Sequence, residues 1–102
     1  MKLEGEIIIE ERKIREYLLP WRAKDDKSKF LVELGYKDDN WFELQSDIRH
    51  IVENNEAEFS KESPFGGSLY RVVGNLKESL VITIWLWIDT ENEVRFITLF
   101  PE

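Results

Sequence analysis

The stretch that decides the fold is SLVITIWLWIDTENEVRFITLF, residues 79–100. Residues 79–89 and 94–100 are rich in β-branched and aromatic side chains, which are typical of strands. The short polar segment where they meet, residues 89–93, contains Asp, Thr, Glu and Asn, and residues of this kind are common in turns. We therefore expect an antiparallel hairpin that forms the spine of a C-terminal sheet.

The first strand of this hairpin is apolar on both faces, because successive side chains point to opposite sides of a sheet. We expect the aliphatic set to pack under helices; it comprises Leu80, Ile82, Ile84, Leu86 and Ile88. The other set is expected on a helix-free face; it comprises Val81, Thr83, Trp85 and Trp87. An exposed stripe of this kind would be a recognition surface. The alternative is that the twisted sheet wraps over the tryptophan rings and buries them.

The register of the hairpin decides which side chains share a face. A two-residue turn at positions 91–92 places Trp85 opposite Thr98. The same register places Trp87 opposite Phe96. A slip of one residue would send Thr98 to the core side instead, and the turn lacks the Asn-Gly pair that would fix the choice. The expected register puts four residues on the helix-free face: Thr83, Trp85, Phe96 and Thr98.

Upstream of the hairpin, the spacing of apolar residues predicts three helices, over residues 10–19, 26–34 and 41–54. The apolar stripe of the first helix comprises Ile14, Tyr17 and Leu18, and that of the third comprises Trp41, Leu44, Ile48 and Ile51. Pro20 ends the first helix and Gly35 the second. The second helix is expected to be capped by Asp25 or Asp26, and the third by Asp39 or Asn40.

After the third helix the period changes from 3.6 to 2, which predicts strands over residues 57–61 and 68–74. The isoleucines at 7–9 form either an edge strand or a tether. Short connections imply that consecutive strands are neighbours. We therefore predict an α+β fold in a single domain, residues 1–102, with three N-terminal helices packed on one face of a four-stranded antiparallel meander sheet.

The composition excludes several classes of protein. The chain of 102 residues has no cysteine, which excludes disulfides, thiolate catalysis and cysteine-ligated metals. Its longest apolar run, residues 80–88, is shorter than the roughly 18–20 residues of a membrane span, so we expect a cytoplasmic protein. The net charge of −7 disfavours non-specific binding of nucleic acid, although basic residues crowd between Arg12 and Lys29.

No sequence motif indicates a metal, a nucleotide or a nucleophilic triad. The acidic pairs at 25–26 and 38–39 are interpreted as helix caps rather than metal ligands. His50, the only histidine, lies off the apolar stripe of its helix and is interpreted as solvent-facing rather than as a general base. We therefore expect neither a metal nor another cofactor.

The remaining residue types support one metal-independent reaction, cleavage of RNA by the neighbouring 2′-hydroxyl. This reaction needs a group that helps to deprotonate the hydroxyl, a cation beside the phosphorane and a donor to the leaving oxygen. Trp85 would supply an aromatic surface for an unstacked base. Candidates for the other roles are Lys13, Lys27 or Lys29, Arg71, Thr83, Arg95 and Thr98.

Six short motifs follow one another along the chain: KIREYLL (13–19), DKSKF (26–30), LGY (34–36), GSLYRVVG (67–74), TIW (83–85) and TLFP (98–101). Their order resembles a bacterial family of uncharacterised small domains, and the resemblance covers residues 8–101. The family's order of helices and strands is similar to the barnase/EndoU/colicin/RelE-type fold. Members of that superfamily are metal-independent ribonucleases, many of them toxins of toxin–antitoxin or contact-dependent inhibition systems.

By this resemblance, a cleft on the open sheet face would be lined by the catalytic residues Lys13, Lys29, Arg71, Thr83, Arg95 and Thr98. The chain departs from the pattern because it is acidic and lacks a well-placed histidine. The competing hypothesis is a non-catalytic module, such as an immunity protein or a toxin–antitoxin partner, whose acidic surface holds a basic protein. Its binding residues would be Trp85, Trp87 and Tyr70. A domain without any ligand is a third possibility.

Overall fold

The computed structural model describes residues 1–20 and 26–102. Its strands are β1 (Glu6–Ile8), β2 (Ala57–Glu62), β3 (Ser68–Leu76), β4 (Ser79–Ile88) and β5 (Glu93–Pro101). Its helical segments are the π-helix η1 (Lys13–Leu18), α1 (Asp26–Glu33), the short 3₁₀ turn η2 (Asp38–Asn40), α2 (Trp41–Asn54) and the 3₁₀ turn η3 (Asp89–Glu91). The predicted cap at Asp25 lies outside the described residues.

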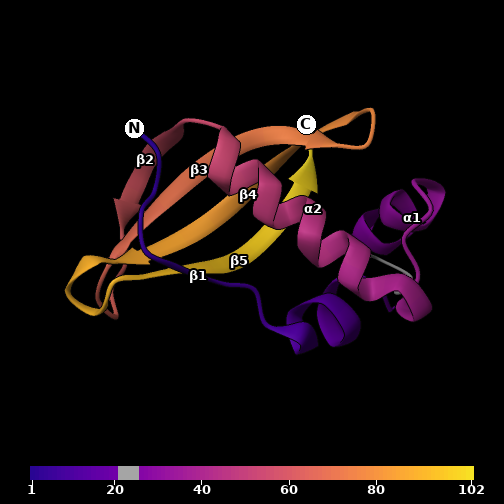
Figure 1. The fold of residues 1–102 in the computed structure, drawn as a ribbon, viewed down its shortest axis with the longest axis horizontal. Coiled ribbons are helices and arrows are strands. Elements are labelled where there is room, and N and C mark those ends of the chain that lie inside the picture. The colour runs from indigo at the N-terminus through magenta and orange to yellow at the C-terminus, as the bar shows by residue number, and fades with distance from the viewer. Residues whose placement is uncertain (21–25) are drawn as a thin grey trace.

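The five strands form one mixed sheet in the order β1-β5-β4-β3-β2 (Figure 1). The pairs β2–β3, β3–β4 and β4–β5 are antiparallel, but β1 pairs with β5 in parallel, with Ile7 opposite Val94. The prediction of a four-stranded antiparallel meander is therefore wrong, although the α+β class is confirmed. The hairpin leaves one edge of β5 unpaired, and the N-terminal isoleucines satisfy part of that edge. No local sequence signal specifies such a pairing between the two ends of a chain.

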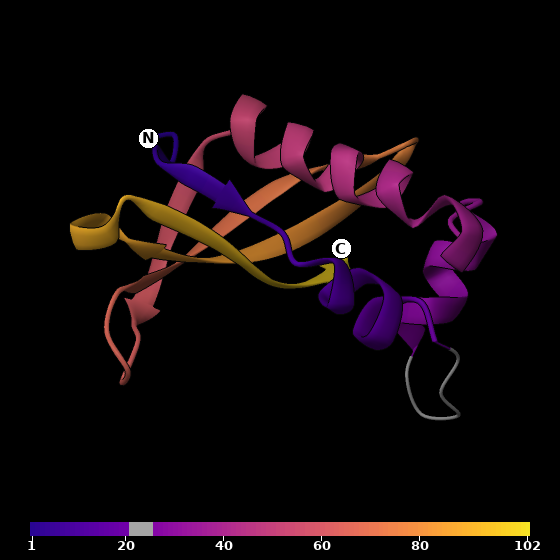
Figure 2. The ribbon, with the colours of Figure 1, turned by 60° about the horizontal axis from the view of Figure 1, so that its bottom comes forward.

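The helices do not pack together on one face of the sheet, so this part of the prediction is also wrong. Of the helices in the described residues, α2 alone runs along the sheet, whereas η1 and α1 lie beyond the end of the sheet, beside the C-terminal end of β5 (Figure 2). η1 is a π-helix whose wide turn is closed by Leu19 N–H donating to Ile14 O at 3.0 Å. Within the described ranges, no helix is long and apolar enough to cross a membrane.

The core lies between α2 and the odd-numbered side chains of β4. Trp85 and Thr83 are both fully buried. The even-numbered side chains are half-buried or exposed, and Leu80 is 47% exposed. The predicted assignment of the two faces is therefore reversed. The structure shows why: β3 alternates strictly, and its outward Arg71 and Asn75 lie opposite the even-numbered residues Ile84 and Leu80 of β4.

The hairpin register also differs from the prediction. The turn contains four residues, Asp89 to Asn92, because Ile88 pairs with Glu93. Asn92 closes the turn in the left-handed region with φ of 55°. Trp85 consequently lies opposite Phe96, and Thr98 lies opposite Ile84 after an irregularity in the ladder. Thr98 thus lies on the face away from α2, while Thr83 lies on the buried face.

Candidate functional site

Four polar side chains meet at the C-terminal end of β5: Lys13, Tyr17, Lys27 and Thr98. Lys27 Nζ donates to Thr98 Oγ1 at 2.8 Å and to the Tyr17 hydroxyl at 3.0 Å. The hydroxyl oxygens of Tyr17 and Thr98 are 3.5 Å apart. Lys13 lies on the same turn as Tyr17, with Nζ 5.4 Å from the centre of the tyrosine ring. We call Tyr17, Lys27 and Thr98 the Tyr17 cluster.

Each member of the Tyr17 cluster comes from a different element. Tyr17 lies on η1, where the wide π turn keeps Lys13, four residues earlier, on the same side of the helix. Lys27 lies in the first turn of α1, and its ammonium is 5.1 Å from the centre of the Tyr17 ring. Thr98 is carried by β5. Single-turn π segments are often found at functional sites, so the position of Tyr17 on η1 supports a functional role for this residue.

Hydrogen bonds with Thr98 and Lys27 lower the pKa of Tyr17 below its ordinary value of 10.0, while partial burial opposes this shift. The direction follows from the geometry. Lys27 donates to both hydroxyl oxygens, which leaves the Thr98 hydroxyl proton available for the Tyr17 oxygen. Two donors directed at one phenol oxygen stabilise its anionic form. The cluster therefore favours a phenolate at lower pH than an isolated tyrosine does.

A hollow of about 370 Å³ lies beside this cluster and is lined by Glu10, Arg12, Lys13, Glu16 and Tyr17. A larger hollow of about 670 Å³ uses the same turn; its walls are Glu10, Glu11, Arg12, Arg15, Glu16 and Asp38. In the larger hollow Arg15 forms ion pairs with Glu11 and Asp38, and its hydrogen bond to Asp38 lowers the pKa of that carboxyl group. Of these two hollows, the smaller one is lined by a member of the Tyr17 cluster, Tyr17 itself.

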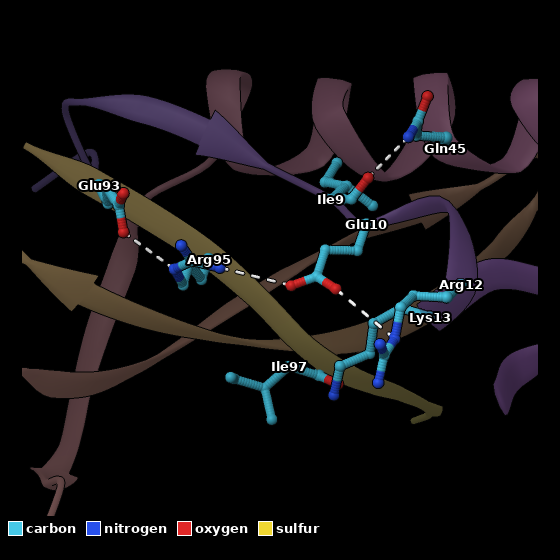
Figure 3. A network of polar contacts seen from close by, with 8 residues as sticks. All are labelled: Ile9, Glu10, Arg12, Lys13, Gln45, Glu93, Arg95 and Ile97. Carbon is cyan, nitrogen blue, oxygen red and sulfur yellow. Dashed lines mark hydrogen bonds and ion pairs between the residues drawn. The ribbon is translucent and has the colours of Figure 1, made fainter. Parts of the chain in front are cut away.

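Arg95, a predicted catalytic residue, is held by two carboxylates. Its Nε donates to Glu93 at 2.9 Å, and its Nη1 lies 3.4 Å from Glu10 (Figure 3). Figure 3 also shows Arg12 reaching the other oxygen of Glu10, at 3.8 Å. The ion pairs of Arg95 with Glu93 and Glu10 raise the pKa of Arg95 and neutralise its charge locally. Arg95 is therefore a poor candidate for binding a phosphate.

The structure brings two of the six predicted catalytic residues, Lys13 and Thr98, to one place. Thr83 is buried, and its hydroxyl donates to Val72 O at 2.6 Å. Lys29 is exposed and makes no hydrogen bond or ion pair with the described residues. Arg71 is exposed as well, and it lies on the helix-free face in the same row as Thr98.

The three predicted binding residues belong to the core side of the sheet. Trp85 is fully buried, and Tyr70 is 9% exposed. Trp87 is partly buried and packs edge-on against Tyr70, with ring centres 5.8 Å apart. The structure therefore offers no exposed tryptophan stripe on these strands to a partner.

Sequence reasoning missed Tyr17 because it counted the residue in the apolar stripe of the first helix. The available signal was Lys13, four residues earlier, since residues at this spacing share a helix face. Lys27 was considered only as an alternative to Lys29. The first turn of α1 directs Lys27, rather than Lys29, at the cluster.

A family model described as "Domain of unknown function (DUF6883)" matches residues 2–102. The chain belongs to this family. No curated protein and no solved structure matches the chain. The predicted membership of a family of uncharacterised small domains is thereby confirmed, whereas the resemblance to ribonuclease toxins stays a prediction.

Among residues 1–20 and 26–102, no group of three or more His, Cys, Asp or Glu side chains is placed to hold a metal ion. At the Tyr17 cluster the described residues bring a phenol of lowered pKa, Tyr17, within hydrogen-bond distance of an ammonium group, Lys27.

Proposed function

We propose that the DUF6883 domain cleaves single-stranded RNA at the Tyr17 cluster by attack of the 2′-hydroxyl on the adjacent phosphate. The new bond joins the 2′-oxygen to phosphorus, and the bond from phosphorus to the 5′-oxygen breaks. The products are a 2′,3′-cyclic phosphate and a free 5′-hydroxyl. Tyr17 takes the proton of the 2′-hydroxyl, and Lys27 donates a proton to the departing 5′-oxygen.

The observation that carries this proposal is the pair of donors at the Tyr17 oxygen, Lys27 at 3.0 Å and Thr98 at 3.5 Å. They lower the pKa of the phenol, and a general base is most effective when its pKa lies near the working pH. The Lys27 ammonium lies where it can stabilise negative charge that develops on the phosphorane. The cluster therefore combines a base and a cation at one point, as the reaction requires.

Arg71 supports the same proposal from the neighbouring surface. Arg71 pairs with Ile84, and Ile84 pairs with Thr98, so the three side chains form one row across the helix-free face. Because adjacent strands are about 4.8 Å apart, Arg71 starts about 10 Å from Thr98. Its guanidinium is exposed and makes no ion pair with the described residues. It can therefore hold a phosphate next to the one that reacts.

The test is incubation of the purified domain with a single-stranded RNA oligonucleotide in the presence of EDTA, with products identified by mass spectrometry. We expect 2′,3′-cyclic phosphate ends, no cleavage of the same sequence as DNA, and loss of cleavage in Tyr17→Phe and Lys27→Met. Lys29→Met is the matched control, since it removes the same charge from the same helix without touching the cluster. Absence of cleavage by micromolar wild-type protein would sink the proposal.

The acidic surface favours a second candidate function, binding of a basic protein. Four carboxylates and two arginines line the hollow of about 670 Å³ beside η1, and the chain has a net charge of −7. Opposite charge accelerates and selects such association. Titration with a lysine-rich peptide tests this function: binding that weakens with salt and in Glu16→Gln supports it, and equal binding by Glu16→Gln opposes it.

A further inference from the structure

The Tyr17 cluster depends on a single extra residue in β5. Trp85 pairs with Phe96, yet the next residue of β4, Ile84, pairs with Thr98, so Ile97 has no partner opposite it. This is a β-bulge. In an uninterrupted ladder Ile97 would face Ile84, and Thr98 would face Thr83 on the buried side. The bulge is therefore what turns the Thr98 hydroxyl toward Tyr17 and Lys27.

A bulge leaves backbone groups that the ladder does not satisfy. Within the described residues, β1 pairs with β5 only as far as Arg95, so the edge of β5 at Ile97 faces no strand. Lys13 occupies this place: its Nζ donates to Ile97 O at 3.0 Å, in a partly buried position (Figure 3). A hydrogen bond from a charged donor to a carbonyl is stronger than one from a neutral donor. The bond thus joins η1 to the bulge itself.

The buried side of the sheet fixes the residue that precedes the bulge. Trp85 Nε1 donates to Thr83 Oγ1 at 2.7 Å. The Trp85 ring packs edge-on against Phe96 with ring centres 5.4 Å apart. The packing against Trp85 thus fixes Phe96, the residue before the bulge, while Lys13 binds the carbonyl of Ile97, the bulged residue.

We infer that Lys13 is a positioning residue: by holding the carbonyl of Ile97, it fixes the bulge that presents Thr98 to Tyr17 and Lys27. Lys13 acts through the backbone and not on the substrate. The catalytic consequence rests on the proposed function, but the positioning itself does not.

The experiment compares Lys13→Met, Lys13→Arg and wild type by NMR without RNA, following contacts between the Thr98 methyl group and the Tyr17 ring. We expect the contact to weaken strongly in Lys13→Met and to be retained in Lys13→Arg, which keeps a charged donor. Arg12→Met is the matched control, because it removes a neighbouring charge on the same turn without touching Ile97. Wild-type Thr98 contacts in Lys13→Met would overturn the inference.

Deletion of Ile97 provides an independent variant. It removes the bulge but leaves Thr98 next to Phe96 in sequence, so an uninterrupted ladder still places Thr98 opposite Ile84. In this background, Lys13→Met should not change the contact between Thr98 and Tyr17. If Lys13→Met alone does not fold, folding of the double variant with the Thr98 contact intact supports the inference. Failure of the double variant to fold, when the deletion alone folds, contradicts it.

Catalysis gives a third readout once RNA cleavage is established. A misplaced Thr98 should lower kcat in Lys13→Met on the order of 10²-fold with little change in KM, because the geometry and not the affinity is lost. Lys13→Arg should restore most of kcat. If the domain cleaves no RNA while the NMR contacts change as expected, the proposed function fails and the positioning role of Lys13 stands.

Discussion

Lys27 Nζ lies 2.8 Å from Thr98 Oγ1, although 71 positions separate the two residues in the chain. This contact ties the start of α1 to the last strand and completes the pair of donors at Tyr17. Replacement of Thr98 by valine should therefore raise the pKa of Tyr17, because one donor to the phenol oxygen is lost. Thr98→Ser keeps the hydroxyl and should leave the pKa near the wild-type value. Titration of the Tyr17 Cζ resonance by NMR measures the pKa in both variants. An equal change in the Tyr17 pKa in Thr98→Val and Thr98→Ser would contradict the role of the hydroxyl.

The pH dependence of RNA cleavage should follow the ionisation of Tyr17. A general base acts in its deprotonated form, so the rate should rise with pH up to the pKa of Tyr17, which lies below 10.0. Tyr17→Phe should reduce kcat by about 10²–10⁴-fold and remove this rising limb. Rates measured from pH 5 to pH 10 at constant ionic strength test both statements. A rising limb that persists unchanged in Tyr17→Phe would assign the base to another group.

Removal of the Arg71 charge should weaken the binding of RNA and its dependence on salt. Each phosphate contact to a single strand contributes about 0.7 to the slope of log K against log salt concentration. Arg71→Gln should therefore reduce this slope by about 0.7 when binding of an uncleavable 2′-deoxy oligonucleotide is measured. Lys37→Gln, which removes an exposed charge just before η2, is the control. Equal slopes for Arg71→Gln and the wild type would exclude Arg71 from the RNA-binding surface.

Arg95→Gln should have little effect on cleavage, in contrast to the role that the sequence predicted. The guanidinium is already paired with Glu10 and Glu93, so it contributes little free positive charge to a phosphate. Exposed ion pairs of this kind contribute little to stability. We expect a change in kcat/KM of less than about threefold. A loss as large as that of Lys27→Met would restore Arg95 to the site.

Thr83 should matter for stability and not for catalysis. Its buried hydroxyl accepts from Trp85 Nε1, so Thr83→Val leaves that N–H without a partner. An unpaired buried donor costs about 1–3 kcal/mol of unfolding free energy, measurable by urea denaturation. In a Trp85→Phe background, which lacks the donor, Thr83→Val should cost less. Strong loss of cleavage at unchanged stability would instead indicate a direct role for Thr83.

The sequence alone located the elements that local patterns encode. The stripe of Leu44, Ile48 and Ile51 predicted α2, and the alternation in residues 79–100 predicted the β4–β5 hairpin. Both signals are local, because a period of 3.6 or 2 reflects which side of one element is buried. Lys13 and Thr98 could be chosen as candidates from residue type and resemblance, but their separate roles could not.

The tertiary structure decided which face of β4 is buried. Alternation divides a strand into two faces, and in β4 both faces are apolar, so the pattern itself cannot tell them apart. The information lies in the neighbouring strand, where Arg71 and Asn75 point away from α2. It becomes usable only when β3 and β4 are paired in the correct register.

The tertiary structure also decided the position of Thr98, and with it the whole candidate site. The hairpin sequence predicted a regular ladder, whereas the observed bulge at Ile97 is held by Lys13, 84 positions earlier in the chain. An interaction between residues so far apart in the sequence leaves no local pattern, because it depends on how η1 packs against the edge of β5. The sequence thus determined the strands and α2, and the packing of the two ends of the chain determined where chemistry can occur.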